Sequence, residues 1–215
     1  YHKAFEPVTE KNLAWVVYDP FRSLDNLVTL DEEVSISEAK LFYRAGGQTM
    51  IDTTSIGIKR DPLALARISR ATGINIIMGS GYYIGLLHPK GMDEKTEEEI
   101  AEEIVGDFTD GVGDTGIRSG IIGELGCSWP LTSNERKVLR ASGRAQQATG
   151  APILIHPGRD ETAPLEIIEV LSEVGADLSR TIMGHLDRTV FLHDTLKKIA
   201  ESRCYREGDV VGAEQ

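Results

Sequence analysis

Cysteines, positive charge and long apolar runs are all scarce in this sequence. Only two cysteines, Cys127 and Cys204, occur among 215 residues, which excludes a disulfide framework and leads us to expect a reducing, cytoplasmic setting. A formal net charge of −11 argues against nucleic acid as a partner, because phosphate contacts need clustered Lys and Arg. No apolar run approaches the length of a membrane span, so a membrane is not an expected partner either.

The composition is that of a globular chain, with 40% hydrophobic and 27% charged residues. A chain of 215 residues is long enough to bury a sizeable core, as one domain or as part of one. It begins at Tyr1 rather than at a methionine, and it ends at Gln215 with no terminal helix or cap. We therefore expect residues 1–215 to form a single partial domain, a fragment of a longer protein.

Strand and helix signals alternate along the chain from residue 48 onward. Short apolar runs predict strands, and segments with helical periodicity, several of them opened by an N-cap residue or a proline, predict helices between them. Strands are expected at 48–52, 74–78, 120–124, 151–156 and 181–185, with a sixth beginning at Cys204. Helices are expected at 62–72, 93–108, 133–149, 164–174 and 194–202.

Sustained alternation of strand and helix predicts a parallel α/β sheet, either in a barrel or in a doubly wound fold. The spacing is that of βα units, with 32 residues from Ile121 to Ile153 and 29 from Ile153 to Ile182. A doubly wound sheet binds its ligand at a switch point between two strands. Here three consecutive strands would all supply one site, which favours a (β/α) barrel.

Three consecutive predicted strands each end on a potential metal ligand: Glu124, His156 and His185. Alone, a histidine at a strand end is more often a hydrogen-bonded structural residue, and a lone glutamate is more often solvated. The repetition changes this balance, because parallel strands bring their carboxyl ends to one edge, where barrels carry their chemistry. A divalent cation at that edge would hold the carboxylate and two neutral imidazoles together.

Three segments surround these ligands: residues 120–132 (GIIGELGCSWPLT), 155–159 (IHPGR) and 184–189 (GHLDRT). With weaker similarity over almost the whole chain, they resemble the phosphotriesterase family of the amidohydrolase superfamily. The resemblance implies a (β/α)8 TIM barrel of the metal-dependent hydrolase type. Relative to that barrel, the chain is expected to lack the first and last strands.

The resemblance also implies a centre of two divalent metal cations, with zinc as the expected metal, that share and activate a hydroxide. Matched residue by residue, Glu124 is the bridging carboxylate and the expected catalytic residue, while His156 and His185 bind one of the ions. Many relatives bridge with a lysine that must first be carboxylated, whereas Glu124 is a carboxylate as it stands. The family also uses a His-x-His pair on its first strand and an aspartate ending its eighth, and this sequence has neither.

Three further residues are candidates for binding a small-molecule substrate. Arg159 and Arg188 each follow a predicted ligand histidine by three residues, and their planar guanidinium groups suit an anionic substrate group. A surface ion pair is an equally good interpretation of either arginine. Tyr83, after the second predicted strand, would either line the same pocket or pack against its neighbours.

The resemblance does not decide which bond is cleaved, because one fold and one metal centre serve several chemistries. The animal branch of the family is associated with small N-acyl compounds, so we expect a small anionic amide such as N-acetyltaurine. Phosphotriesters and lactones are the alternative substrates. Two other readings are a truncated barrel that only binds a ligand and a metal-independent enzyme with Glu124 as general base. A homodimer is left open.

Overall fold

In the described part of the chain, six parallel strands form one sheet, and their order in the sheet is their order in the chain. They are β1 (Thr49–Asp52), β2 (Asn75–Ser80), β3 (Ile121–Gly126), β4 (Ile153–His156), β5 (Thr181–Met183) and β6 (Tyr205–Arg206). A consecutive order is that of a (β/α) barrel, whereas a doubly wound sheet reverses its order at a switch point. The predicted α/β class and parallel sheet are confirmed, and closure into eight strands stays a prediction.

The structure, a computed structural model, describes residues 2–28 and 31–209. Its contacts divide the chain into two compact units. The first consists of Tyr1–Gln48 and Arg67–Ile74, and the second consists of Thr49–Ala66 and Asn75–Gln215. The second unit contains the whole sheet. The single partial domain expected over residues 1–215 stays a prediction.

The first unit consists mainly of helices that the sequence patterns did not predict. They are η1 (His2–Phe5), α1 (Leu13–Tyr18), η2 (Pro20–Arg22), α2 (Leu24–Leu27) and α3 (Glu32–Arg44). Asp31 starts α3, because its carboxylate accepts hydrogen bonds from the backbone N–H groups of Glu33 and Val34. The other helices span at most six residues, which is too short for a periodic apolar pattern to show.

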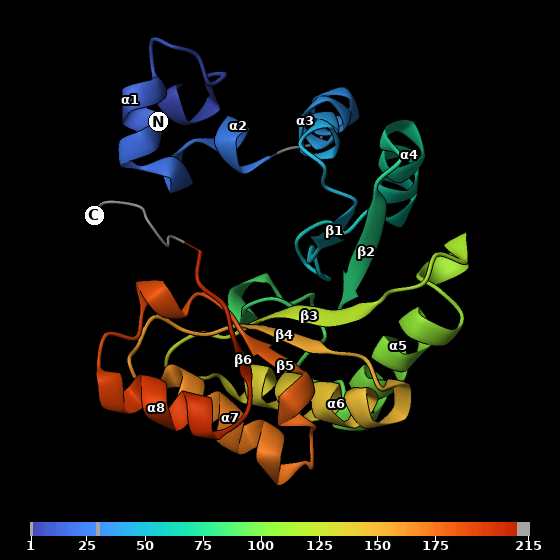
Figure 1. Ribbon diagram of the computed structural model, residues 1–215, viewed down its shortest axis with the longest axis vertical. Helices are drawn as coiled ribbons and strands as arrows, with labels where there is room; N and C mark the ends of the chain where they lie inside the picture. The colour runs from blue at the N-terminus through green and yellow to red at the C-terminus, as the bar shows by residue number, and fades with distance from the viewer. Residues whose placement is uncertain (1, 29–30, 210–215) are drawn as a thin grey trace. The chain divides into compact units, whose positions relative to one another are not determined.

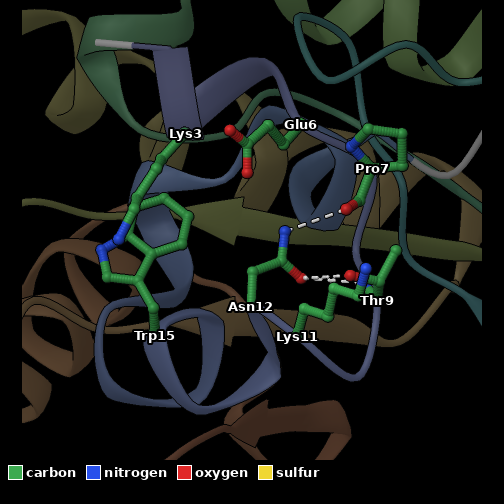
Figure 2. Close-up of a pocket in the computed structure, with 7 residues that line it drawn as sticks. All are labelled: Lys3, Glu6, Pro7, Thr9, Lys11, Asn12 and Trp15. Atoms are coloured by element: carbon green, nitrogen blue, oxygen red, sulfur yellow. Dashed lines mark hydrogen bonds between the residues drawn. The ribbon is translucent and has the colours of Figure 1, made fainter.

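A cavity in the first unit is formed by residues of η1, of α1 and of the turn between them (Figure 2). It is lined by Lys3, Glu6, Pro7, Thr9, Lys11, Asn12 and Trp15. The Asn12 amide donates a hydrogen bond to the Pro7 carbonyl oxygen at 2.9 Å and accepts one from the Thr9 backbone N–H at 2.7 Å. Among the described residues that line it, none has a buried side-chain polar atom without a partner. The cavity thus shows no group that calls for a ligand.

Helices of the second unit lie along one side of strands β3 to β6 (Figure 1). They are α5 (Glu97–Thr109), α6 (Ser133–Thr149), α7 (Ala163–Glu173) and α8 (His193–Glu201), while α4 (Pro62–Thr72) follows β1. Short 3₁₀ turns lie at η3 (Gly85–Leu87), η4 (Gly113–Thr115), η5 (Leu178–Arg180) and η6 (Leu186–Arg188). None of the described helices is both long and apolar enough to cross a membrane.

The core of the second unit lies between the sheet and these helices. Ile153 and Ile155 of β4 are fully buried and belong to the same apolar cluster as Ile167 and Leu171 of α7. Because successive residues of a strand point to opposite faces, the residue after Ile155, His156, faces away from the helices. One face of the sheet thus stabilises the unit, and the other is free to carry chemistry.

Helix starts in this unit are set by side-chain caps. The predicted capping box at the start of α6 is confirmed, with Thr132 and Glu135 each bonded to the backbone of the other. The predicted start of α5 near residue 93 is wrong by four residues, because Thr96 and Glu99 form a second capping box and α5 begins at Glu97. Acidic residues ahead of a capped start therefore belong to the preceding turn.

A buried ion pair joins the β1–α4 loop to β2 and α5. Arg60 and Asp107 meet at 2.6 Å, with both side chains 8% exposed. The same Asp107 oxygen accepts a hydrogen bond from the Ser80 hydroxyl at 2.6 Å, and Arg60 also donates to the Gly79 carbonyl oxygen at 3.1 Å. Each charge is therefore both paired and hydrogen-bonded, as a buried charge must be.

Replacing Asp107 with alanine is expected to destabilise the protein by about 3–5 kcal/mol, because the Arg60 guanidinium would stay buried without its counter-charge. Urea unfolding measures this loss. Glu98→Ala is the matched control, since Glu98 pairs with Arg144 across 3.6 Å at the surface and should contribute less than about 1 kcal/mol. Equal losses in the two variants would contradict a structural role for the buried pair.

Glu135 connects the loop after β2 to the loop after β3. Its Oε1 atom accepts hydrogen bonds from the Gly85 backbone N–H at 2.8 Å and from the Ser128 backbone N–H and hydroxyl at 3.1 and 2.7 Å. Its Oε2 atom accepts from the Thr132 backbone N–H at 2.8 Å. Burial raises the pKa of Glu135, but these donors outweigh burial and hold that pKa below its usual range.

Because the pKa of Glu135 is lower in the folded chain, its stabilising effect is present above the unfolded-state pKa, about 4.5, and is lost as the pH falls through the folded-state value. The difference in free energy of unfolding between wild type and Glu135→Gln should be largest near neutral pH and shrink below about pH 4.5. Urea unfolding over this range measures it. A difference that stayed constant with pH would show that the carboxylate charge plays no part.

Candidate metal centre

Glu124 lies in an irregularity of β3 rather than at its end. The sequence predicted a strand over 120–124, but β3 continues for two further residues. Its pairing with β4 shifts between Ile122 and Leu125, which marks a β-bulge around Gly123 and Glu124. Position 123 needs glycine, since φ is 124° and a Cβ would lie 2.3 Å from a β4 carbonyl oxygen. The bulge keeps Leu125 in the helix-side core and leaves Glu124 for the opposite face.

The two histidines come from β4 and from the loop after β5. His156 is the last residue of β4, as predicted. The prediction that β5 extends to His185 is wrong, because β5 ends at Met183 and His185 has a left-handed backbone with φ 60° and ψ 25°. Gly184 lies between them, and a Cβ there would come within 2.8 Å of the Ile155 carbonyl oxygen. The chain turns at this close approach and directs His185 back toward β3.

The three predicted ligands lie together at the carboxyl ends of neighbouring strands. Glu124 Oε1 is 2.9 Å from His185 Nε2, and Glu124 Oε2 is 3.3 Å from His156 Nδ1. The two imidazole rings are in edge contact, with centroids 4.6 Å apart. The three side chains are 15% to 24% exposed, so the cluster is partly shielded from water. The carboxylate thus presents one oxygen to each histidine.

Opposing effects act on the Glu124 carboxylate. Burial raises its pKa, but the hydrogen bond to His156 and the neighbouring charges of His156 and His185 lower it more, and the net shift is downward. Glu124 is therefore an anion at neutral pH. A carboxylate must be ionised to bind a metal ion, so its electrostatic state suits that role.

Two acidic residues that the sequence analysis missed lie beside His185. Asp209 Oδ2 is 2.6 Å from His185 Nδ1, and Glu207 Oε2 accepts a hydrogen bond from the His185 backbone N–H at 3.2 Å. Burial and a hydrogen bond to Asp209 raise the pKa of Glu207. Both residues follow β6, the sixth strand whose start at Cys204 the sequence did predict. Their place after a predicted strand makes them candidates, but the folded sheet is needed to show that they lie beside His185.

The predicted substrate-binding residues lie near the cluster and differ in their exposure and in their contacts. Arg188 is paired with Asp209 at 2.8 Å, whereas Arg159 is exposed. The Tyr83 hydroxyl is 3.4 Å from both ring nitrogens of His156. Burial and the charge of Glu124 raise the pKa of Tyr83, against the lowering effect of Arg188 and Arg159, so its hydroxyl stays protonated at neutral pH. Their role in binding a substrate stays a prediction.

The donor set fits a divalent cation. Ligand atoms of Glu124, His156 and His185 lie within 4.8 Å of one another, and so do those of His185, Glu207 and Asp209. Carboxylate oxygens and imidazole nitrogens are ligands that zinc takes in catalytic sites. His185 joins the two groups, with Nε2 toward Glu124 and Nδ1 toward Asp209. A histidine held by a carboxylate through one nitrogen presents the other to a metal.

The model of the Phosphotriesterase family matches residues 20–215. The chain belongs to this family. A "Phosphotriesterase-related protein" of Nematostella vectensis is 47% identical over 209 residues, which cover 96% of this chain and 60% of that protein. Proteins named "N-acetyltaurine hydrolase" in Dictyostelium discoideum and Homo sapiens are 46% and 41% identical over 97% of this chain. The family resemblance drawn from the sequence is thus confirmed.

The chain covers less than two thirds of the length of these phosphotriesterase-family relatives, 56% of the Dictyostelium protein and 60% of the human one. Solved structures agree on the fold. A resiniferatoxin-binding protein from Rhodobacter sphaeroides is 33% identical with a TM-score of 0.93, covering 97% of this chain and 58% of that one. The phosphotriesterase homology protein from Escherichia coli, solved with phosphate in its active site, is 27% identical with a TM-score of 0.81, covering 92% and 67%.

Replacing Asp209 with alanine is expected to weaken zinc binding about 10- to 100-fold, because His185 would lose the carboxylate that orients its ring. Competition between the protein and a zinc-binding dye measures the affinity. Asp114→Ala removes an exposed carboxylate from η4 and serves as the control with unchanged affinity. Unchanged zinc affinity in Asp209→Ala would show that the 2.6 Å contact is incidental to metal binding.

Proposed function

We propose that this protein is a metal-dependent hydrolase with a binuclear centre of divalent cations, zinc in the first instance, in an eight-stranded barrel. Its proposed substrate is a small anionic N-acyl amide such as N-acetyltaurine. The observation that carries the proposal is the position of the Glu124 carboxylate between His156 and His185, with one oxygen toward each. Relatives named N-acetyltaurine hydrolase, at 46% and 41% identity, support the choice of substrate.

Each residue of the cluster would bind metal in such a site. Glu124 would hold the cations through its carboxylate, and His156 and His185 would bind one of them. When bound, divalent cations would supply a nucleophile at neutral pH by acidifying water and would polarise the carbonyl oxygen of the scissile amide. Glu124 is suited to its part because it is ionised at neutral pH without prior modification.

Groups around the cluster would orient the metal ligands and the substrate. Asp209 accepts from His185 Nδ1 at 2.6 Å and so fixes the ring with Nε2 toward Glu124. The protonated Tyr83 hydroxyl, beside the His156 ring, can donate a hydrogen bond to an oxygen of the substrate. Together these contacts would help to orient the metal ligands and the substrate for reaction.

Ester hydrolysis is the second candidate function. Its support is the likeness to solved lactonases, such as that of Listeria monocytogenes at 27% identity and a TM-score of 0.77, covering 84% of this chain and 60% of that one. A metal centre that polarises an amide carbonyl can also polarise the carbonyl of a lactone or the phosphoryl group of a phosphotriester. Substrate preference then depends on the loops around the centre.

The proposal is tested by measuring bound metal and hydrolysis together in the full-length protein. N-acetyltaurine, a lactone and a phosphotriester are compared as substrates for wild type, Glu124→Gln and His156→Ala. We expect wild type to prefer N-acetyltaurine. Both variants should fold, lose bound metal in elemental analysis and fall to the background rate, because an amide or a methyl group cannot replace the lost ligand.

Glu169→Gln makes the same chemical change as Glu124→Gln at an exposed position of α7, and it should keep both metal and activity. Full activity in protein that elemental analysis shows to be free of metal would overturn the proposal. Turnover of lactones or phosphotriesters but not of N-acetyltaurine would be consistent with the proposed metal centre and would show that the proposed substrate is wrong.

A further inference from the structure

The two arginines near the metal centre differ in what they already bind. Arg188 is engaged by Asp209 at 2.8 Å, and Asp209 is in turn shared with His185. Within residues 2–28 and 31–209, no carboxylate lies at ion-pair distance from Arg159. Arg188 therefore belongs to the support of the metal ligands, whereas the Arg159 guanidinium has its donors available.

The two acidic residues that follow Arg159 in the chain accept hydrogen bonds from other groups. Asp160 Oδ1 accepts hydrogen bonds from the Thr162 backbone N–H at 2.8 Å and from its hydroxyl at 2.6 Å. Glu161 accepts from the backbone N–H groups of Phe191 and Leu192, both at 3.0 Å, ahead of α8. Both carboxylates of this loop thus accept hydrogen bonds within the protein, and neither forms an ion pair with the Arg159 guanidinium.

The backbone that carries Arg159 is held in place. Pro157 and Gly158, which connect it to His156, are both buried. Gly158 lies so close to the loop after β3 that a Cβ would be 2.7 Å from the Ser128 carbonyl oxygen. Ser128 is itself fixed by its two hydrogen bonds to Glu135. Arg159 is therefore an exposed side chain on a packed segment of backbone, three residues from a proposed metal ligand.

The loop that carries Arg159 borders the site. Arg159 follows the β4 residue His156 by three residues, and the neighbouring Gly158 packs against the backbone of the loop after β3, the strand that carries Glu124. In N-acetyltaurine, the sulfonate is two methylene groups from the amide nitrogen. A substrate whose carbonyl group lies at the metal ligands therefore needs its cationic partner beside the centre, on a neighbouring loop, rather than within the cluster.

Building on the proposed function, we propose that Arg159 is the residue that selects anionic substrates, by binding the sulfonate or carboxylate at the amine end of the N-acyl amide. Its planar fork can donate two parallel hydrogen bonds to such a group. Arg188 has a separate role, which is to position Asp209 beside His185. The two predicted substrate-binding arginines thus divide into one that binds substrate and one that supports a metal ligand.

The test compares two amides in the metal-loaded full-length protein: N-acetyltaurine and N-ethylacetamide, which lacks the sulfonate. Arg159→Gln should raise KM for N-acetyltaurine about 10- to 100-fold with kcat little changed, because the contact is made outside the reacting bond. Arg159→Lys should recover part of this loss, since it keeps the charge but not the fork. For both variants, bound metal and kcat/KM for N-ethylacetamide should equal those of wild type.

Arg144→Gln is the matched control, because it removes one arginine charge from α6, where Arg144 pairs with Glu97 and Glu98. It should leave KM for both amides unchanged. Arg188→Gln gives the opposite pattern to Arg159→Gln, with weaker metal binding as its primary defect. An equal rise in KM for the charged and the neutral amide in Arg159→Gln would overturn the assignment.

Calorimetric titration with ethanesulfonate separates this inference from the proposed function. If wild type hydrolyses N-acetyltaurine and Arg159→Gln has the same KM and the same ethanesulfonate affinity, the role of Arg159 is wrong and the proposed function stands. If wild type hydrolyses neither amide, the proposed substrate is wrong. In that case ethanesulfonate binding that is lost in Arg159→Gln supports the anion site, and binding that is absent from wild type or unchanged in the variant overturns it.

Discussion

The contact between the Glu124 carboxylate and the imidazoles of His156 and His185 is the interaction on which the site depends. A carboxylate that is 15% exposed is costly to bury unless positive charge or hydrogen-bond donors meet it. Here two imidazoles meet it, at 2.9 and 3.3 Å, and a divalent cation would satisfy the same three groups at once. The strand bulge at Gly123 and the left-handed turn at His185 both serve to bring these groups together.

Other polar groups of the second unit stabilise the frame that holds this contact. Asp107 and Arg60 join β2 to the helix layer through a pair of buried charges, and Glu135 joins the loops after β2 and β3 through four hydrogen bonds. Neither group touches the three ligands. Each of these groups is satisfied by partners within the protein, whereas Glu124, His156 and His185 meet one another at the carboxyl ends of the strands, in an arrangement that a cation could also satisfy.

The sequence predicts the strands, the α-helices between them and the three candidate ligands Glu124, His156 and His185, because each depends on local patterns: short apolar runs, caps, and a polar residue at the end of a run. It does not predict the bulge at Glu124, which arises only when β3 pairs with β4. Asp209 is hidden for a similar reason. It lies 24 residues beyond His185 in a chain with many acidic residues, so only the folded sheet identifies it as the partner.

Whether a metal ion binds between these side chains is the central question. An anomalous-difference map from crystals of the zinc-loaded protein, recorded on both sides of the zinc absorption edge, answers it directly. We expect zinc density next to the Glu124 carboxylate, within coordination distance of His156 and His185, at about 2.0–2.2 Å from the nitrogen and oxygen ligands. A map with no zinc at Glu124, obtained from crystals of active protein, would contradict it.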